Sequence, residues 1–190
     1  MARKVQINKE IILQAALEML IREGYSTVNI KSLAKEIGCS TQPIAWHFGN
    51  MDGLRKELST YALAYANEKM RSSTNGMTAF TNVGIAYLDI AFDQPNLFRY
   101  LYMSGDSGYF AGGFDVLTTA YDNATMVDQI ALHLKIPKEN VNTFFQNTMI
   151  YTHGLASFIA SGIIKASKEE VAQMVNQAAH SFLLQAGADI

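Results

Sequence analysis

The chain has 190 residues, of which 49% are hydrophobic and 17% are charged, and its formal net charge is -2. This composition predicts a substantial buried core and excludes an intrinsically disordered chain. No apolar run reaches the about 18 residues that a membrane span needs, and the N-terminus lacks the apolar stretch of a secretory signal, so we expect a cytoplasmic protein. A single cysteine, Cys39, excludes an internal disulfide.

The charge is unevenly distributed along the chain. Residues 1–58 carry eight Lys or Arg against six Asp or Glu, a balance of +2, whereas the remainder carries seven against eleven, a balance of -4. A balance of +2 is too weak to identify a nucleic-acid-binding protein by charge alone. Any such function has to be argued from sequence motifs.

The first predicted helix lies between Asn8 and Gly24. Asn8 can act as its N-cap, and apolar residues then recur at helical spacing from Ile11 to Leu20. Gly24 is the residue type that ends a helix, because it tolerates a positive φ angle.

The stretch from Ile30 to Phe48 has the spacing of a helix-turn-helix. Ala34, the fifth residue, supplies the small side chain that two crossing helices need. Gly38, the ninth, suits the positive φ of the turn, and Ile44, the fifteenth, can lock the second helix onto the first. This spacing is the most informative feature of the chain.

Three further polar residues stand where helices should begin. Asn29, Ser40 and Asn50 are expected to be the N-caps of the second, third and fourth helices. Pro43 then lies in the first turn of the third helix, where a missing N–H is tolerated. The fourth helix should run to about Arg71.

The rest of the chain also shows helical periodicity. Its expected helices cover residues 80–91, a short segment from Pro95, residues 114–134, residues 141–159 and residues 171–182. The fold class is therefore predicted to be all-α, with about nine helices. We expect a helix-turn-helix domain over residues 1–50, a connector helix over 51–75 and a larger helical domain over 76–190.

The sequence from Ile11 to Leu54 resembles the DNA-binding domain of the TetR family of transcriptional regulators. The resemblance includes the Gly24 turn, the LAKEIG crossing, the HF pair at residues 47 and 48, and Asn50. It implies a homodimeric regulator, with repression as the expected action, whose third helices enter successive major grooves of a near-palindromic operator. It also implies that a small molecule bound in each C-terminal domain weakens the binding of DNA.

The resemblance and the chemistry of the side chains together suggest the DNA contacts. Thr41, Gln42 and Pro43 are best placed to read base edges, since an amide can pair with adenine and apolar groups can contact a thymine methyl. Phosphate contacts are expected from Lys31, Ser40 and His47. His47 could instead be a packed, hydrogen-bonded histidine.

Two positions depart from the family pattern. Ala45 stands where a tyrosine usually touches the DNA backbone, and Met51 stands where a lysine is usual. Both changes remove a phosphate contact and should lower affinity for DNA. The indole of Trp46 could compensate by donating to a phosphate, or its ring could pack on the start of the fourth helix.

Many aromatic residues in the C-terminal part suggest a cavity for a small apolar or aromatic effector, although each of them alone could be ordinary core. The candidate ligand-binding residues are Phe80, Tyr87, Phe98, Tyr102, Phe110, Phe114, Tyr121, Phe145, Met149 and His153.

The last two helices are rich in small residues, and the resemblance implies that they pair with those of a second copy. An enzyme is not expected, since the four histidines lack metal-ligand spacing and no nucleophile with a base is apparent. No cofactor or metal is expected either. The remaining alternative is a helical dimer that binds a ligand or a protein partner and has a weakened or lost DNA site.

Overall fold

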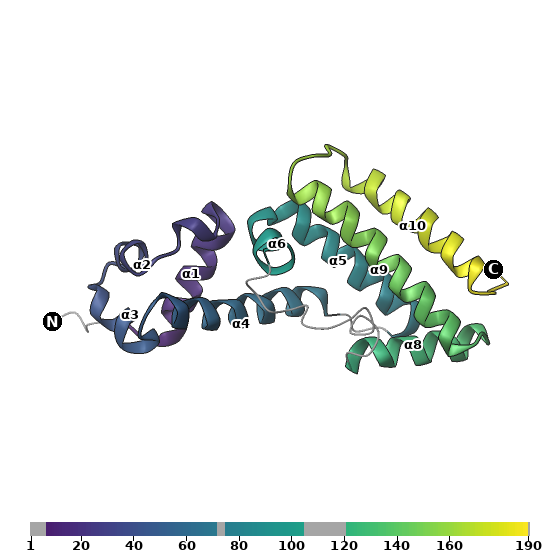
Figure 1. The fold of residues 1–190 in the computed structure, drawn as a ribbon, viewed down its shortest axis with the longest axis horizontal. Coiled ribbons are helices and arrows are strands. Elements are labelled where there is room, and N and C mark those ends of the chain that lie inside the picture. Colours follow the sequence, from purple (N-terminus) through teal and green to yellow (C-terminus); the bar gives the residue numbers. More distant parts are fainter. Residues whose placement is uncertain (1–6, 72–74, 105–120, 190) are drawn as a thin grey trace. The chain divides into compact units, whose positions relative to one another are not determined.

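In the computed structural model, residues 7–71, 75–104 and 121–189 are described, and all of their regular secondary structure is helical (Figure 1). The prediction of an all-α fold with about nine helices is confirmed. The nine α-helices in these ranges are α1 (Lys9–Glu23), α2 (Ile30–Ile37), α3 (Thr41–Phe48), α4 (Met51–Met70), α5 (Gly76–Asp93), α6 (Pro95–Tyr102), α8 (Tyr121–Leu134), α9 (Lys138–Ala160) and α10 (Lys168–Gln185). Across the same ranges, no helix is both long enough and apolar enough to cross a membrane.

Three of the predicted N-caps are confirmed. The Asn8 side chain accepts a hydrogen bond from the N–H of Ile11 at 2.9 Å, and that of Asn50 accepts one from Gly53 at 3.0 Å. Asn29 forms a capping box with Ser32. These caps satisfy N–H groups that have no partner inside the helix and so define where α1, α2 and α4 begin.

Ser40 stands at the N-cap position of α3, as predicted, but does not cap through its side chain. Its backbone is extended, as an N-cap requires, and its hydroxyl makes no capping hydrogen bond. A capping side chain accepts from the second or third N–H of the helix, and Pro43, the third residue of α3, has no N–H, so that only the N–H of Gln42 is left for it. The Ser40 hydroxyl is not used to begin the helix.

The chain forms two compact units. The N-terminal unit comprises Met1–Ala66 and Gln94–Tyr109, and the C-terminal unit comprises Asn67–Asp93 and Phe110–Ile190. The chain thus leaves the N-terminal unit within α4 and returns to it for α6. The helix that begins at Pro95 belongs with the helix-turn-helix rather than with the helices around it in the sequence.

Side chains from five helices, α1, α2, α3, α4 and α6, build the core of the N-terminal unit. Its fully buried residues include Ile12, Leu20, Leu33, Ile44, Leu54, Leu58, Leu97, Phe98 and Leu101. Polar contacts tie α6 into this core, since the Asn96 amide donates to the carbonyl of Ile21 at 3.0 Å and the hydroxyls of Tyr100 and Ser59 lie 2.7 Å apart. The first of these bonds satisfies a carbonyl in the last turn of α1.

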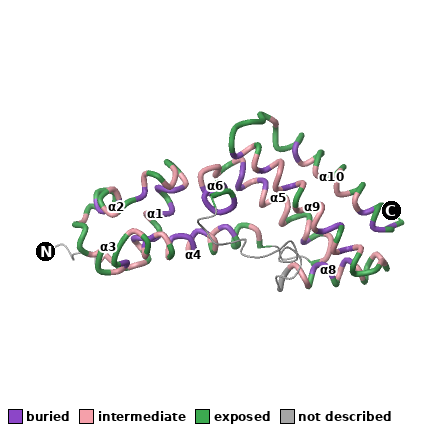
Figure 2. Tube along the Cα trace, in the orientation of Figure 1, coloured by how far each residue is buried: buried purple, intermediate pink, exposed green. Residues whose placement is uncertain are grey.

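The C-terminal unit packs α5, α8 and α10 around α9. On one side, the ring of Phe80 lies 4.4 Å from that of Phe145. At the start of α10, the Lys168 ammonium pairs with Asp89 at 2.7 Å and Asp93 at 2.8 Å, both on α5. Figure 2 shows α10 as largely exposed, and only Val171 and Leu183 are buried among its residues.

Candidate nucleic-acid interface

The turn between α2 and α3 has the geometry that the helix-turn-helix spacing predicts. Gly38 adopts the left-handed conformation, with φ +74° and ψ +35°, and ends α2. Ala34 is 5% exposed at the crossing, and Ile44 is fully buried beneath it. The small residue, the turn residue and the apolar lock therefore occupy their expected places.

Helix α3 has a buried side and an outward side. Ile44 and Phe48 anchor it in the core, whereas Thr41, Gln42 and Ala45 are exposed. Pro43 is half-buried, and Ser40, just before the helix, is exposed. The first turn therefore offers a hydroxyl and an amide to the surroundings, the groups that hydrogen-bond to base edges.

Trp46 is the most unusual residue of this outward side. It is 80% exposed, so its ring is not buried against the start of α4. Its main ring contact is the edge of His47, with centroids 4.6 Å apart. An indole in this position offers both an apolar ring and an N–H donor to an incoming partner.

His47 is half-buried at the end of α3, where its Nε2 lies 3.3 Å from the carbonyl oxygen of Ile7. Because a carbonyl only accepts, Nε2 carries the proton of this hydrogen bond. In the protein without DNA, His47 is therefore a packed, hydrogen-bonded histidine.

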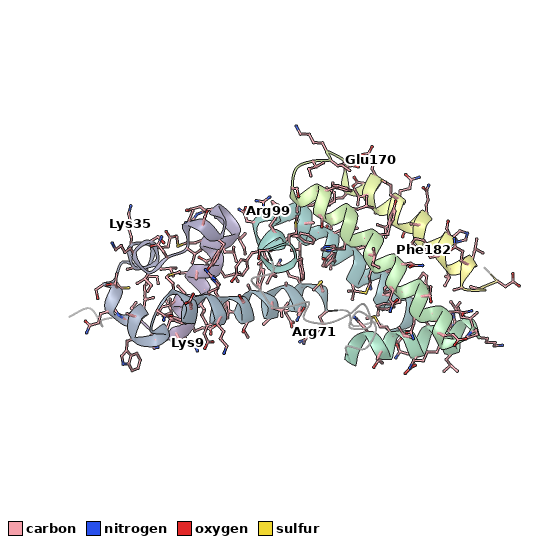
Figure 3. All side chains as sticks on the ribbon, in the orientation of Figure 1. Lys9, Lys35, Arg71, Arg99, Glu170 and Phe182 are labelled. Carbon is pink, nitrogen blue, oxygen red and sulfur yellow. The ribbon has the colours of Figure 1, made fainter. Side chains whose placement is uncertain are left out.

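The positively charged side chains near α3 differ in whether they are paired with carboxylates. Lys9 pairs with Glu57 at 2.8 Å, and Arg22 contacts Glu23 at 2.7 Å and Glu36 at 3.1 Å. The glutamates also raise the pKa of the Arg22 guanidinium. By contrast, α2 presents Lys31 and Lys35 as exposed side chains, and Figure 3 shows Lys35 pointing away from the helices.

A contact that the sequence analysis missed joins α3 to α4. Gly49, just after α3, has a φ of +73°. A Cβ atom on Gly53 would lie 2.0 Å from the carbonyl oxygen of Phe48, far below van der Waals contact. Only glycine fits at position 53. The feature of the sequence that could have revealed this contact was a glycine in the first turn of a predicted helix.

The candidate ligand-binding residues are distributed over both units. Phe80, Phe145 and Met149 belong to the apolar cluster of the C-terminal unit. Phe98 and Tyr102 lie in α6, in the N-terminal unit, and are buried. Phe110, Phe114 and the side chain of Tyr121 lie outside the described residues.

Two of these residues form a polar pair inside the C-terminal unit. The Tyr87 hydroxyl lies 2.7 Å from Nδ1 of His153, and the hydroxyl of Ser157 lies 3.4 Å from Nε2 of the same ring. Burial lowers the pKa of His153 and so favours its neutral form. Ser157 was missed by the sequence analysis, although it stands one helical turn after His153.

The described residues contain no group of three His, Cys, Asp or Glu side chains that could hold a metal ion.

Comparison with known proteins identifies the domain that contains α3. Residues 12–58 match the family model described as "Bacterial regulatory proteins, tetR family". The N-terminal domain is thus of the TetR type. Over 175 residues it is 24% identical to the uncharacterized HTH-type transcriptional regulator YobS of Bacillus subtilis (strain 168), covering 89% of this chain and 84% of YobS.

Solved structures share the fold of the chain. A TetR-like transcriptional regulator from Rhodococcus sp. RHA1 is 14% identical, with a TM-score of 0.64 over 94% of this chain and 99% of that one. A TetR variant from Acinetobacter baumannii AYE in complex with minocycline is 13% identical (TM-score 0.59; 95% and 96% covered). BioQ with its double-stranded DNA operator is 17% identical (TM-score 0.53; 92% and 98% covered). These likenesses show that the chain has the fold of TetR-type proteins.

Proposed function

We propose that this TetR-family regulator is a cytoplasmic repressor that binds a near-palindromic operator as a homodimer and is released by a small molecule. The observation that carries the proposal is the two-sided α3. Ile44 and Phe48 hold the helix in the core, while Thr41, Gln42 and Trp46 face outward. A rigid helix with exposed polar groups in its first turn is suited to the major groove.

Within this proposal, the exposed residues divide into two roles. Gln42 can pair with an adenine edge, and Thr41 and Pro43 can contact a thymine methyl group. Lys31 and Ser40 can hold phosphates, since Lys31 is exposed on α2 and the Ser40 hydroxyl makes no cap. The indole of Trp46 adds a further donor at the same surface.

The homodimer is supported by apolar surface on the last two helices. Ile150 and Phe158 on α9 and Met174 and Leu184 on α10 are between 43% and 48% exposed. Such side chains on adjacent helices are suited to an isologous interface with a second copy. Two copies related by a two-fold axis would present their α3 helices to half-sites about 34 Å apart.

The proposed effector is apolar or aromatic and binds in the C-terminal unit. The supporting feature is the Tyr87–His153 pair, which lies in the same unit as the apolar cluster, because sites for apolar ligands orient them with a few polar groups. The Acinetobacter baumannii TetR variant, which has the same fold, binds minocycline. Binding of the effector should reduce operator affinity, and the operator should reduce effector affinity by the same factor.

A second function is favoured by Ala45 and Met51, which cannot supply the phosphate contacts of the usual tyrosine and lysine. In that case the chain would be a helical dimer that binds a ligand or a protein partner and has lost its DNA site.

The deciding experiment is selection of duplexes from a random DNA library by the purified protein. Enrichment of an inverted repeat is the expected result and would provide the probe for an effector screen. A folded dimer that enriches no sequence at low salt would exclude the repressor and leave the second function.

A further inference from the structure

A surface pocket in the N-terminal unit lies where the end of α1 meets α6. Its volume is about 350 Å³, and it is lined by residues 23–26, which end α1 and form the turn after it, and by Ser104 and three residues of α6. All of its lining residues belong to the same compact unit. The volume is near the lower limit of ligand pockets, about 300 Å³, so the pocket suits a small molecule.

The guanidinium of Arg99 is the cation of this pocket. Its Nη2 donates to the side-chain oxygen of Asn96 at 2.5 Å, and the Asn96 nitrogen donates in turn to the Ile21 carbonyl on α1 at 3.0 Å. The guanidinium is thus held relative to both helices. A guanidinium carries five N–H donors in a planar fork, which is the geometry that binds a carboxylate through two parallel hydrogen bonds.

The aromatic side of the pocket is held in place by α4. The rings of Tyr25 and Tyr100 stack with their centroids 4.8 Å apart. Arg55 Nε donates to the Tyr25 hydroxyl at 2.7 Å, and the hydroxyls of Ser59 and Tyr100 lie 2.7 Å apart. A pocket whose walls are already fixed loses less conformational freedom when a ligand binds.

Glu23 adds a carboxylate to the lining. The Arg22 guanidinium holds it, with Nε at 2.8 Å and Nη2 at 2.7 Å from the same carboxylate oxygen. Glu23 and Arg99 are the only charged side chains among the lining residues. Because like charges repel, Glu23 disfavours a dianion such as phosphate beside Arg99.

Ser104 provides a second acceptor in the same pocket. Its hydroxyl donates to the Tyr100 carbonyl at 2.7 Å, so toward a ligand this oxygen acts as an acceptor. A well-matched ligand therefore has a carboxylate for Arg99 and a hydrogen-bond donor for Glu23 or Ser104. A small carboxylic acid with a hydroxyl or ammonium group of its own meets both requirements.

We propose that the pocket binds a small hydroxy acid or amino acid, whose carboxylate pairs with Arg99 and whose hydroxyl or ammonium group donates to Glu23. The site goes beyond the proposed function, because it lies wholly in the N-terminal unit, whereas the proposed effector binds in the C-terminal unit. Binding there does not require operator DNA, so the site can be tested without it.

Four probes distinguish this ligand class from other anions. L-lactate and L-alanine carry the donor, propionate has the carboxylate without it, and inorganic phosphate is the dianion. Each is titrated into the full chain at constant ionic strength and followed by amide NMR spectra. Lactate or alanine should give saturable shifts at residues 23–26 and 96–104. Its binding should be about tenfold or more tighter than that of propionate, which lacks a hydrogen bond to a charged group. Phosphate should give no saturable shift there.

Substitutions assign the two contacts. Arg99→Gln removes the cation and should abolish saturable binding, whereas Arg71→Gln, which removes an exposed arginine of the C-terminal unit, should leave the dissociation constants unchanged. Glu23→Gln should weaken binding of lactate or alanine by about tenfold or more and change that of propionate by less than about twofold. If thermal unfolding shows that Arg99→Gln does not fold, Arg99→Lys replaces it and should weaken binding, because it loses the planar fork.

Three results would overturn the proposal. The first is the absence of saturable shifts with both lactate and alanine. The second is binding of propionate or phosphate as tight as that of lactate and alanine. The third is a folded Arg99 variant that retains the affinity of the wild type. Binding of only one of lactate and alanine would support the proposal and identify the donor as a hydroxyl or an ammonium group.

Discussion

The backbone of Gly53 lies directly against the carbonyl oxygen of Phe48, where a Cβ atom would be only 2.0 Å from that oxygen. Phe48 ends α3 and Gly53 is in the first turn of α4, whose N-cap is Asn50. Helix α3 is thus joined to α4 by backbone contact, and a side chain at position 53 would force the two apart.

Gly53→Ala should therefore destabilise the protein. Because the clash is with a backbone atom, no side chain can move to relieve it, and we expect a loss of about 2 kcal/mol or more in the free energy of unfolding. Denaturant titration measures this loss. Gly84→Ala, in the interior of α5, is the control, since no atom lies within 4 Å of its added Cβ and stability should be unchanged or raised by up to about 1 kcal/mol. Equal stability of the two variants would contradict the contact.

The departures at positions 45 and 51 can be reversed. Ala45 is exposed and Met51 half-buried at the start of α4, so Ala45→Tyr and Met51→Lys should each fit. Both should strengthen operator binding, and the lysine should steepen the salt dependence by about one unit. Thr78→Lys adds the same charge on α5 and should leave the salt dependence unchanged. If Met51→Lys has no more effect than Thr78→Lys, position 51 does not face DNA.

The proposed dimer can be broken without disturbing the core. Met174 and Leu184 are 43% and 48% exposed on α10, so replacing both by Glu should leave the monomer folded and place four carboxylates in the interface. Sedimentation analysis should then find a monomer. Leu132→Glu, on α8 and outside the proposed interface, is the control, because Leu132 is 82% exposed. A monomer from the control, or a dimer from the double variant, would place the interface elsewhere.

Half-buried His153 should make stability depend on pH. Burial lowers its pKa in the folded chain, whereas the unfolded chain has a value near 6.5. Below about pH 6.5 the unfolded state therefore binds a proton more readily than the folded state, and stability falls on acidification. His153→Gln should reduce the loss between pH 7.5 and pH 5.5, measured by denaturant titration, while Ser157→Ala should retain it. An unchanged loss in His153→Gln would assign the effect to other groups.

The sequence predicted the helix-turn-helix in detail because its determinants are local. Ala34, Gly38 and Ile44 act on neighbours within the same 19-residue stretch, and each occupies its expected place. The missing side-chain bond at the Ser40 cap is also local, since Pro43 removes one of the two N–H groups from which the hydroxyl could accept. The Gly53 contact required knowledge of how α4 turns away from α3, which residue types alone do not give.

Contacts between distant segments were beyond the sequence. The Tyr87–His153 bond spans 66 positions, and the Asn96–Ile21 bond spans 75. Periodicity predicts that these helices have buried sides but not which helix covers them. For the same reason, Phe98 and Tyr102 were grouped with the C-terminal aromatics, although α6 belongs to the N-terminal unit.

The return of the chain to the N-terminal unit at Gln94 limits how the protein can be engineered or recombined. An N-terminal fragment cut after residue 66 would lack α6 and would leave the surface that packs on Leu97, Phe98 and Leu101 open to water. A chimera that exchanges operator specificity should therefore transplant residues 94–104 with the first 66, or change only the exposed positions of α3. In this architecture, the portable part for a new operator is a few side chains and not a domain.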